Sequence, residues 1–267
     1  MANVALEFAR VTLIFDGVVA LDNVSFQVRA GDSLVVLGVA ASGKSTLLKL
    51  SLGLLKPDAG EIYLFGEQIS GMSEQELLPV RRHIGMVFQE SALFDSFTVA
   101  GNVAYPLVNQ PGQTAGPEEV EERVRQALRF VELEHAIDKL PSELSGGMRR
   151  RVGIARAIVN RPRLVLYDSP TAGLDPITAH TIMTLVLKER DTAGVTSLLV
   201  THRLQNGHLL ANFRYQGAAL VPAASDGGPR SQTRFLVLQE GRVAFLGDQE
   251  ELNRQQDPYL RKFVMSQ

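Results

Sequence analysis

A glycine-rich segment, Gly38–Ser45 (GVAASGKS), has the spacing G-x-x-x-x-G-K-[ST] that is typical of phosphate-binding loops. Backbone N–H groups of such a loop surround a phosphate, and the following helix adds partial positive charge at its N-terminus. Lys44 can place its ammonium between the β- and γ-phosphates of a nucleotide, and the Ser45 hydroxyl can bind Mg²⁺. The alternative is an ordinary glycine turn with a chance Lys-Ser pair, but a predicted strand before the segment and a predicted helix after it favour the phosphate site.

A carboxylate, Asp168, follows the short apolar run Leu164–Tyr167 and supplies a partner for this loop. In parallel sheets a carboxylate at the C-terminal end of a buried strand lies beside the first phosphate loop, where it can hold Mg²⁺, usually through water. On its own, Asp168 could equally cap a turn or a helix. Together with Gly38–Ser45, it predicts a metal-binding carboxylate.

A second anion site is predicted at Leu144–Met148 (LSGGM), directly before the helical run Arg149–Asn160. Two glycines and a serine at a helix start offer backbone N–H groups to phosphate oxygens, and a simple N-cap at Ser145 is the alternative. Two copies of the chain packed head to tail could clamp one γ-phosphate between these two sites. Each copy would then complete the site of the other.

The elements that must position these residues follow from the hydrophobic periodicity. We expect strands at Val4–Phe8, Val24–Val28, Leu34–Leu37, Glu61–Phe65, Ile84–Phe88, Leu164–Tyr167, Ser197–Val200, Phe235–Leu238 and Val243–Leu246. We expect helices at Lys44–Leu54, Ser73–Arg82, Glu118–Val131, Ser145–Asn160 and Thr178–Thr192, and a short helical tail. Strands that alternate with helices predict an α/β fold with a mostly parallel sheet. The turn-rich stretch Val108–Pro117 is expected to be a surface connection, and Gln216–Gln232 a loop or small irregular insertion.

The composition excludes several classes of protein. With 27 Lys and Arg against 29 Asp and Glu in 267 residues, the net charge of −2 gives no field that favours nucleic acid or an anionic bilayer. The absence of cysteine excludes disulfide scaffolds, thiolate metal sites and thiol catalysis. The start of the chain has no basic region ahead of an apolar run, and the apolar run Leu34–Ala41 is too short to cross a bilayer. We therefore expect any function at a membrane to need another chain that supplies the spanning part.

In combination, these motifs resemble the ATPase subunit of an ATP-binding-cassette (ABC) transporter over nearly the whole chain. They occur in the order Phe15, Gly38–Ser45, Gln89, Leu144–Met148, Asp168, Asp175 and His202. The resemblance implies an α/β fold of the P-loop NTPase type, with a RecA-like, mostly parallel sheet core, an antiparallel β subdomain and a helical subdomain. Within one ATP-binding domain of 1–267, it places the core at about 1–90 and 161–248, the helical subdomain at about 91–160, the irregular insertion at about 216–232 and the tail at about 249–267.

The resemblance also implies ATP and Mg²⁺ as cofactors. In the family, an aromatic residue near Phe15 stacks on adenine, Gln89 contacts Mg²⁺ and the attacking water, and His202 bonds the γ-phosphate. Each has an alternative, because Phe15 could pack in the core, Gln89 could be a loop amide, and His202 could cap the next helix. The residues expected to act in catalysis are Lys44, Gln89, Ser169 and His202, and those expected to hold Mg²⁺ are Ser45, Gln89 and Asp168.

A homodimer that encloses two nucleotides is implied as well. In the family, Ser145 and Gly147 contact the γ-phosphate bound to the opposite subunit, and Asp175 lies at the dimer contact. The residues expected to bind nucleotide are therefore Phe15, Gly38, Val39, Ala40, Ala41, Ser42, Gly43, Lys44, Ser45, Thr46, Gln89, Ser145, Gly146, Gly147, Asp175 and His202. The neighbouring run of Arg149, Arg150 and Arg151 is interpreted as a solvated helix face, because no aromatic platform for nucleic acid accompanies it.

The chain departs from the family at two positions. Ser169 follows Asp168 where the family normally has a glutamate that polarises the attacking water, and loss of a general base typically costs ~10²–10⁴ in rate. Slow turnover through His202, Gln89 and a water held by Ser169 stays possible, because positioning and charge stabilisation carry most of phosphoryl transfer. Ala41 stands where many relatives have glycine, and alanine is expected to serve there only if its φ stays negative.

The amino-acid sequences of three segments resemble those of Mla-type phospholipid transporters. These segments are ALFDSFTVAGNVAYPL, PSELSGGMRRRVGIARAI and the tail DPYLRKFV. The resemblance implies phospholipid traffic, a membrane permease, an Mce lipid-binding protein and a STAS-domain protein as partners, and a peripheral place at the cytoplasmic face of the bacterial inner membrane. Leu93, Phe94 and Phe97 are expected to form a patch for a permease helix, with core packing as the alternative.

Three hypotheses of function compete. The first is the energising ATPase of a lipid transporter. The second is a nucleotide-gated clamp that dimerises on ATP but hydrolyses it poorly, because Ser169 replaces the usual glutamate. The third is a soluble cassette of the DNA-repair or translation class, which is disfavoured because the sequence has no coiled-coil insertion, zinc module or second cassette. No nucleic acid partner is therefore expected.

Overall fold

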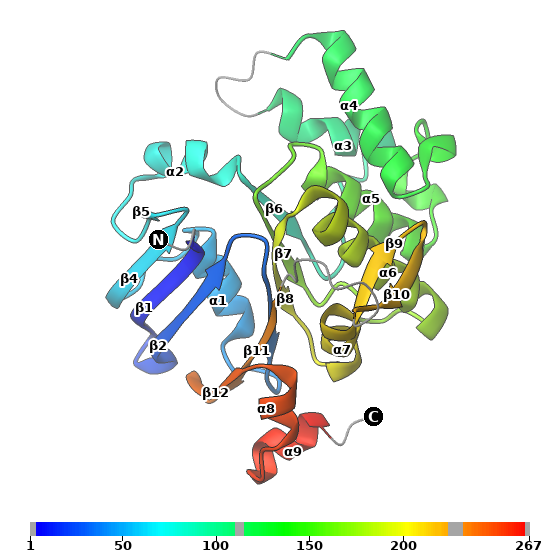
Figure 1. The fold of residues 1–267 in the computed structure, drawn as a ribbon. Helices are drawn as coiled ribbons and strands as arrows, with labels where there is room; N and C mark the ends of the chain where they lie inside the picture. Colours follow the sequence, from blue (N-terminus) through cyan, green and yellow to red (C-terminus); the bar gives the residue numbers. More distant parts are fainter. Residues whose placement is uncertain (1–3, 110–114, 224–231, 265–267) are drawn as a thin grey trace.

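A six-stranded sheet forms the centre of the protein (Figure 1). The computed structural model describes residues 4–109, 115–223 and 232–264, so parts of the predicted connection Val108–Pro117, the insertion Gln216–Gln232 and the tail lie outside the described residues. The strand order is β12-β11-β3-β8-β7-β6, with parallel neighbours except for the antiparallel pair β11–β12. The strands are β3 (Ser33–Leu37), β6 (Ile84–Val87), β7 (Leu164–Asp168), β8 (Thr196–Val200), β11 (Thr233–Gln239) and β12 (Arg242–Gly247).

Nine α-helices are described in 4–109, 115–223 and 232–264. They are α1 (Lys44–Ser51), α2 (Glu74–Arg81), α3 (Val99–Val108), α4 (Pro117–Phe130), α5 (Gly146–Ile158), α6 (Pro176–Ala193), α7 (Leu204–Asn212), α8 (Gln249–Asn253) and α9 (Pro258–Val264). Strands and helices alternate along the sheet, which confirms the predicted α/β fold. None of the helices in the described part is both long and apolar enough to span a bilayer.

The strands of the central sheet separate two hydrophobic clusters. Along β3, Val35 and Leu37 belong to the cluster that includes α3, α5 and α6, whereas Leu34 and Val36 belong to the cluster that includes α1 and the first two strands. Successive side chains of a strand point to opposite faces, so both faces of β3 are covered. This is why its sequence reads as a continuous apolar run, as is typical of a buried parallel strand.

An antiparallel sheet of order β2-β1-β4-β5 lies beside the central sheet, blue and cyan in Figure 1. Its strands are β1 (Val4–Phe15), β2 (Val18–Arg29), β4 (Ala59–Leu64) and β5 (Glu67–Gln68). The first two strands are longer than the predicted Val4–Phe8 and Val24–Val28. Register shifts interrupt their pairing at several points, which breaks the alternation of apolar and polar residues that sequence periodicity relies on.

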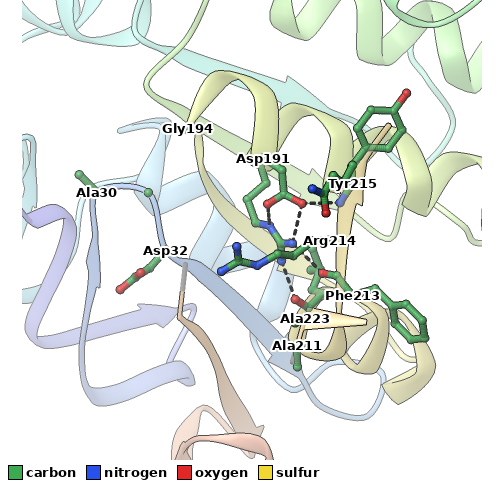
Figure 2. Close-up of a pocket in the computed structure, with 13 residues that line it drawn as sticks. Ala30, Asp32, Asp191, Gly194, Ala211, Phe213, Arg214, Tyr215 and Ala223 are labelled. Carbon is green, nitrogen blue, oxygen red and sulfur yellow. Dashed lines mark hydrogen bonds and ion pairs between the residues drawn. The ribbon is translucent and has the colours of Figure 1, made fainter. Parts of the chain in front are cut away.

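The predicted irregular insertion is in part a regular hairpin. β9 (Phe213–Gln216) and β10 (Ala219–Pro222) pair in antiparallel register, and residues 224–231 lie outside the described part. Arg190 of α6 anchors this hairpin by donating to the carbonyl oxygen of Phe213 at 2.8 Å (Figure 2). The turn at Gly217, which has a positive φ of 58°, joins the two strands.

Two neighbouring charged residues of α6 are buried in different ways. Arg190 pairs with Asp191 at 2.7 Å, and the other carboxylate oxygen of Asp191 accepts the backbone N–H of Tyr215. Glu189 is only 5% exposed, and burial raises its pKa from 4.5 to about 7 against the opposing charge of Lys188. Burial disfavours the ionised form of a carboxyl, so Glu189 holds its proton far longer than an exposed glutamate.

Candidate functional site

A cavity of about 420 Å³ brings together most of the predicted site residues. Four segments reach it directly after the carboxyl ends of parallel strands β3, β6, β7 and β8, which is where ligands bind in sheets of this kind. The loop after β3 supplies most of the lining, together with Gln89, Asp168 and His202. The complete lining is Ala20, Ala40, Ala41, Ser42, Gly43, Lys44, Ser45, Thr46, Gln89, Asp168, Ser169, Val200 and His202.

Two glycines fix the course of the phosphate-binding loop. A Cβ atom on Gly38 would lie 2.3 Å from Ser42 Oγ and 2.8 Å from the carbonyl oxygen of Leu238, so no larger residue fits. Gly43 has a φ of 102°, and a Cβ there would lie 2.7 Å from Leu21 Cδ2. Gly43 is also the N-cap of α1, whose first turn no side chain caps. The first N–H groups of α1 can therefore bind an anion at the cavity.

Lys44 is buried, and its side chain folds back under the first residues of the phosphate-binding loop. Its ammonium donates to the carbonyl oxygens of Gly38 at 2.8 Å and Val39 at 2.7 Å, and lies 3.3 Å from Ser42 Oγ. Burial lowers the pKa of Lys44, and the charge of Asp168 opposes this shift. The carbonyl oxygens of the loop are neutral acceptors that hold the Lys44 ammonium in place. Charged phosphate oxygens are stronger acceptors and can replace them.

Asp168 ends β7, and Ser169 follows it directly. Burial raises the pKa of Asp168, while a hydrogen bond from the Ser169 side chain and the positive charges of Lys44 and His202 act to lower it. Carboxylate, hydroxyl and amide oxygens from Asp168, Ser45 and Gln89 line the same cavity. Mg²⁺ needs only one or two protein oxygens when phosphates and waters complete its shell, so this donor set fits the ion. A group of three or more His, Asp or Glu side chains that could hold a metal is absent from the described residues.

His202 is exposed and lies directly beside the loop. Its Nδ1 is 3.3 Å from the carbonyl oxygen of Gly38. Because a carbonyl oxygen only accepts, this hydrogen bond requires the proton on Nδ1 and leaves Nε2 as the second functional atom of the ring. The N-cap of α7 is Arg203 and no side chain caps this helix, so the histidine does not cap it.

Five of the predicted nucleotide-binding residues lie outside both the loop and the lining of this cavity. Phe15 ends β1 and is 44% exposed, which excludes core packing. Ser145 caps α5 by accepting from the N–H of Met148 at 3.2 Å, and Asp175 caps α6 by accepting from Ile177 and Thr178. Gly147 packs so closely on α6 that a Cβ would lie 2.6 Å from Thr178 Cγ2, while Gly146 faces open space.

The backbone of Ala41 contradicts the expectation of a negative φ. Its φ is +60°, in the left-handed region that glycine adopts without cost. The alanine therefore keeps the conformation that glycine would take, and the loop carries the strain. Ser169, with a φ of 45°, is a second residue of the cavity in this region. Such outliers cluster where the surroundings dictate a functional geometry.

The interpretation of Arg149, Arg150 and Arg151 as a solvated helix face is wrong for Arg150, which is buried, whereas Arg149 is exposed and Arg151 half-buried. Each guanidinium donates to backbone carbonyl oxygens, those of Leu144, Phe88 and Val131 respectively, and Arg150 is only 6% exposed. Arg150 also donates to the carbonyl oxygen of Ala172 at 3.2 Å, so it joins α5 to the segments that carry Gln89 and Asp175. The sequence gives no signal for these hydrogen bonds, because all the acceptors are main-chain carbonyl oxygens, which every residue has.

An aromatic cluster lies on the surface at α3. Phe94 and Phe97 are about two-fifths exposed, and their rings lie 4.6 Å and 6.2 Å from that of Tyr105. Leu93, a predicted member of the patch, packs against the core, and Tyr105, which the sequence does not predict, belongs to the observed cluster. Asn102, fully buried, supports the segment by donating to the carbonyl oxygens of Phe94 and Phe97.

Comparisons with known proteins decide the family. The family model described as ABC transporter matches residues 21–172, more than half of the chain. This chain belongs to the ABC transporter family. The ABC cassette MJ0796, in a dimer bound to ADP and phosphate, superposes with a TM-score of 0.75 at 30% identity over 91% of this chain and 98% of that one. A cassette of the cbiONQ ABC transporter complex of Clostridium perfringens superposes with a TM-score of 0.79 at 29% identity over 98% of this chain and 93% of that one.

Curated relatives of this ABC protein carry the name methionine import ATP-binding protein. That of Corynebacterium diphtheriae is 42% identical over 76% of this chain and 60% of its own length. That of Rhodococcus jostii is 38% identical over 92% of this chain and 65% of its own length. The chain thus spans about half to two-thirds of the relatives that it matches. Their names do not support the expected lipid cargo.

Proposed function

We propose that the chain is the ATP-binding subunit of an ABC transporter and couples binding and hydrolysis of MgATP to transport through a membrane permease. One observation carries the proposal. The loop with Lys44, the carboxylate Asp168, and the polar residues Gln89 and His202 come from four separate segments and line one cavity. The uncapped start of α1 lies at this cavity, which supports the binding of an anion there.

We assign the roles in this cavity by the chemistry of each group. Backbone N–H groups of Gly43–Thr46 surround the phosphates, and Lys44 turns from its carbonyl acceptors to phosphate oxygens. Ser45, Gln89 and Asp168 hold Mg²⁺, which neutralises charge on the phosphates. His202 donates to the γ-phosphate, and exposed Phe15 stacks on the base.

A dimer is proposed because the second glycine site is separate from this cavity. Ser145, Gly146 and Gly147 begin α5, and the first two are exposed. The dimeric arrangement of the MJ0796 cassette supports the same assembly here. The signature of one copy would then complete the nucleotide site of the other, with Asp175 at the contact.

Catalysis in this dimer lacks its usual base, because Ser169 is neutral and short. A Ser169-held water, Gln89 and His202 support slow turnover in our proposal. The alternative is a nucleotide-gated clamp, favoured by the same residue, that dimerises on ATP and hydrolyses it barely or not at all. Both sites of a homodimer would carry the substitution.

We propose that the aromatic cluster of Phe94, Phe97 and Tyr105 docks the permease. It belongs to the proposed helical subdomain of about 91–160, set apart from the core of about 1–90 and 161–248. The subunit then lies peripherally at the cytoplasmic face of a bacterial inner membrane. An Mce lipid-binding protein and a STAS-domain protein are further proposed partners.

The cargo is proposed to be lipid, on the resemblance of three segments to Mla-type transporters. The names of the curated relatives support a second cargo, methionine. Purification with the neighbouring permease in detergent separates the two, because a lipid transporter co-purifies with phospholipid and its ATPase responds to phospholipid. A response to methionine alone would reverse the choice.

The core proposal is tested by nucleotide binding and assembly. We expect MgATP to convert the chain to a dimer in size-exclusion chromatography, and Lys44→Ala to abolish both binding and dimer. Lys56→Ala, which changes an exposed lysine beyond α1, is the matched control and should behave as the parent. A parent that does not bind MgATP, alone or with its permease, would refute the proposal.

A further inference from the structure

The C-terminal helix α9 reaches the phosphate-binding loop through the side chain of Tyr259. The Tyr259 hydroxyl donates to the carbonyl oxygen of Leu238 at 2.7 Å and accepts the backbone N–H of Val39 at 3.3 Å. One hydroxyl thus joins three segments, namely α9, the end of β11 and the start of the loop. The tail, red in Figure 1, is thereby connected to the cavity by a side chain outside its lining.

The position of the Tyr259 ring is fixed by the packing of α9. Asp257 begins this helix by accepting from the N–H groups of Tyr259 and Leu260. Leu260 and Phe263 are 3% and 8% exposed and belong to the hydrophobic core. The rings of Tyr259 and Phe263 meet edge to face at 5.5 Å. The ring therefore needs no hydroxyl to stay in place, and the hydroxyl is free to act on the loop.

Val39 connects the tyrosine to the catalytic lysine. Its N–H donates to Tyr259, and its carbonyl oxygen accepts the Lys44 ammonium at 2.7 Å. The adjacent Gly38 accepts the same ammonium, and it leaves no room for a Cβ because the carbonyl oxygen of Leu238 is too close. The Val39 backbone, which helps to hold Lys44, is thus itself held by the Tyr259 hydroxyl.

We propose that Tyr259 is a positioning residue, which fixes the start of the phosphate-binding loop and so sets nucleotide affinity from the C-terminal helix. The inference rests on the proposed function of the cavity as an ATP site. Without the hydroxyl, the Val39 N–H loses its acceptor and the Gly38–Val39 peptide can rotate. Phosphate binding would then have to order the loop at the cost of affinity.

The test compares Tyr259→Phe with the parent in the full chain. Tyr63→Phe is the matched control, because within the described part of the chain the Tyr63 hydroxyl bonds Glu61 on strand β4, away from the cavity. We expect Tyr259→Phe to raise the Kd for MgATP and for ADP about three- to tenfold, the factor that one neutral hydrogen bond usually contributes. KM should rise with Kd while kcat stays within about twofold, because Asp168, Gln89 and His202 are untouched. Hydrogen exchange of the Val39 amide should speed up in the same variant only.

The outcomes are distinct. A variant that binds nucleotide like the parent overturns the proposal, whatever its hydrogen exchange. A lower melting temperature with unchanged Kd marks Tyr259 as purely structural and also overturns it. A drop in kcat without a rise in KM assigns the tyrosine to the chemical step instead of to positioning, and contradicts the proposal. A parent without measurable affinity for MgATP removes the proposed function itself.

Discussion

Replacement of Ser169 by glutamate should accelerate ATP hydrolysis. Ser169 lies at the cavity next to Asp168, is 4% exposed, and is tied to β8 by its N–H, which donates to the carbonyl oxygen of Val200 at 2.9 Å. The backbone is therefore held by β8, and we expect a longer side chain to extend into the cavity that Ser169 lines. A carboxylate there would accept the proton of the attacking water.

The size of the gain follows from two opposing effects. A general base contributes ~10²–10⁴ in rate. Against this, Ser169→Glu places a second carboxylate beside Asp168, whose pKa burial already raises, and removes the Ser169 hydrogen bond that lowers that pKa. Like charges hold part of the pair protonated. We therefore expect the lower end of the range, an increase in kcat of about 10²-fold. The backbone strain is unchanged, because serine and glutamate have the same difficulty with a φ of 45°.

The assay is steady-state phosphate release at saturating MgATP, followed from pH 6 to pH 9. The Glu variant should gain rate as pH rises, because its base must be ionised, whereas the parent should lack this rise. Ser169→Gln has nearly the same shape without the base and should stay slow. If the parent turned over as fast as the Glu variant, or if the Gln variant matched the Glu variant, the missing base would not limit hydrolysis.

Three further predictions concern stability, each measured by urea unfolding. Ala41→Gly should raise the free energy of unfolding by about 0.5–1 kcal/mol. Relief of the positive φ contributes ~1–2 kcal/mol, which exceeds the ~0.4–1 kcal/mol that glycine costs by adding conformational entropy to the unfolded chain. A lower free energy of unfolding would show that the loop is unstrained. The raised pKa of Glu189 means that the unfolded chain releases this proton first, so stability falls as pH rises from about 4.5 to about 7. Glu189→Gln should remove this fall, gaining about 3 kcal/mol relative to the parent between pH 4.5 and pH 8, and parallel pH profiles would refute the assignment. Arg150→Leu should cost about 2–3 kcal/mol, because two part-buried carbonyl oxygens lose the charged donor that a buried side chain gives them. Arg150→Lys should recover less than half, and full recovery by lysine would show that bridging two carbonyls is unimportant.

The sequence predicts the residues of the cavity better than the strands beside it. Gly38–Ser45, Asp168 and His202 each follow a short apolar run, and the carboxyl ends of parallel strands share one edge of a sheet. That rule brings them together without any knowledge of side-chain contacts. The long hairpin of β1 and β2 obeys no such rule, since its bulges shift the alternation. The sequence therefore predicts only the first part of β1 and the last part of β2 as strands.

Contacts between distant segments explain the rest of what the sequence does not reveal. Tyr259 and Val39 are 220 residues apart and meet through a main-chain atom, so neither residue type marks the other. Arg150 likewise finds carbonyl oxygens that any residue could supply. The conformation of Ala41 depends on the loop around it, whereas the sequence argument considered only the intrinsic preference of alanine.

The place of β3 in the central sheet has a consequence for biosynthesis. Ser33 pairs with Ser197 on one side and with Thr233 on the other, so both neighbours of this strand are translated long after it. Pairings between such distant segments form late and leave unpaired strand edges in the meantime. A nascent chain released before β11 therefore leaves one edge of β3 with unpaired backbone N–H and C=O groups, next to the phosphate-binding loop. Premature termination should yield aggregation-prone fragments instead of a weakened ATPase.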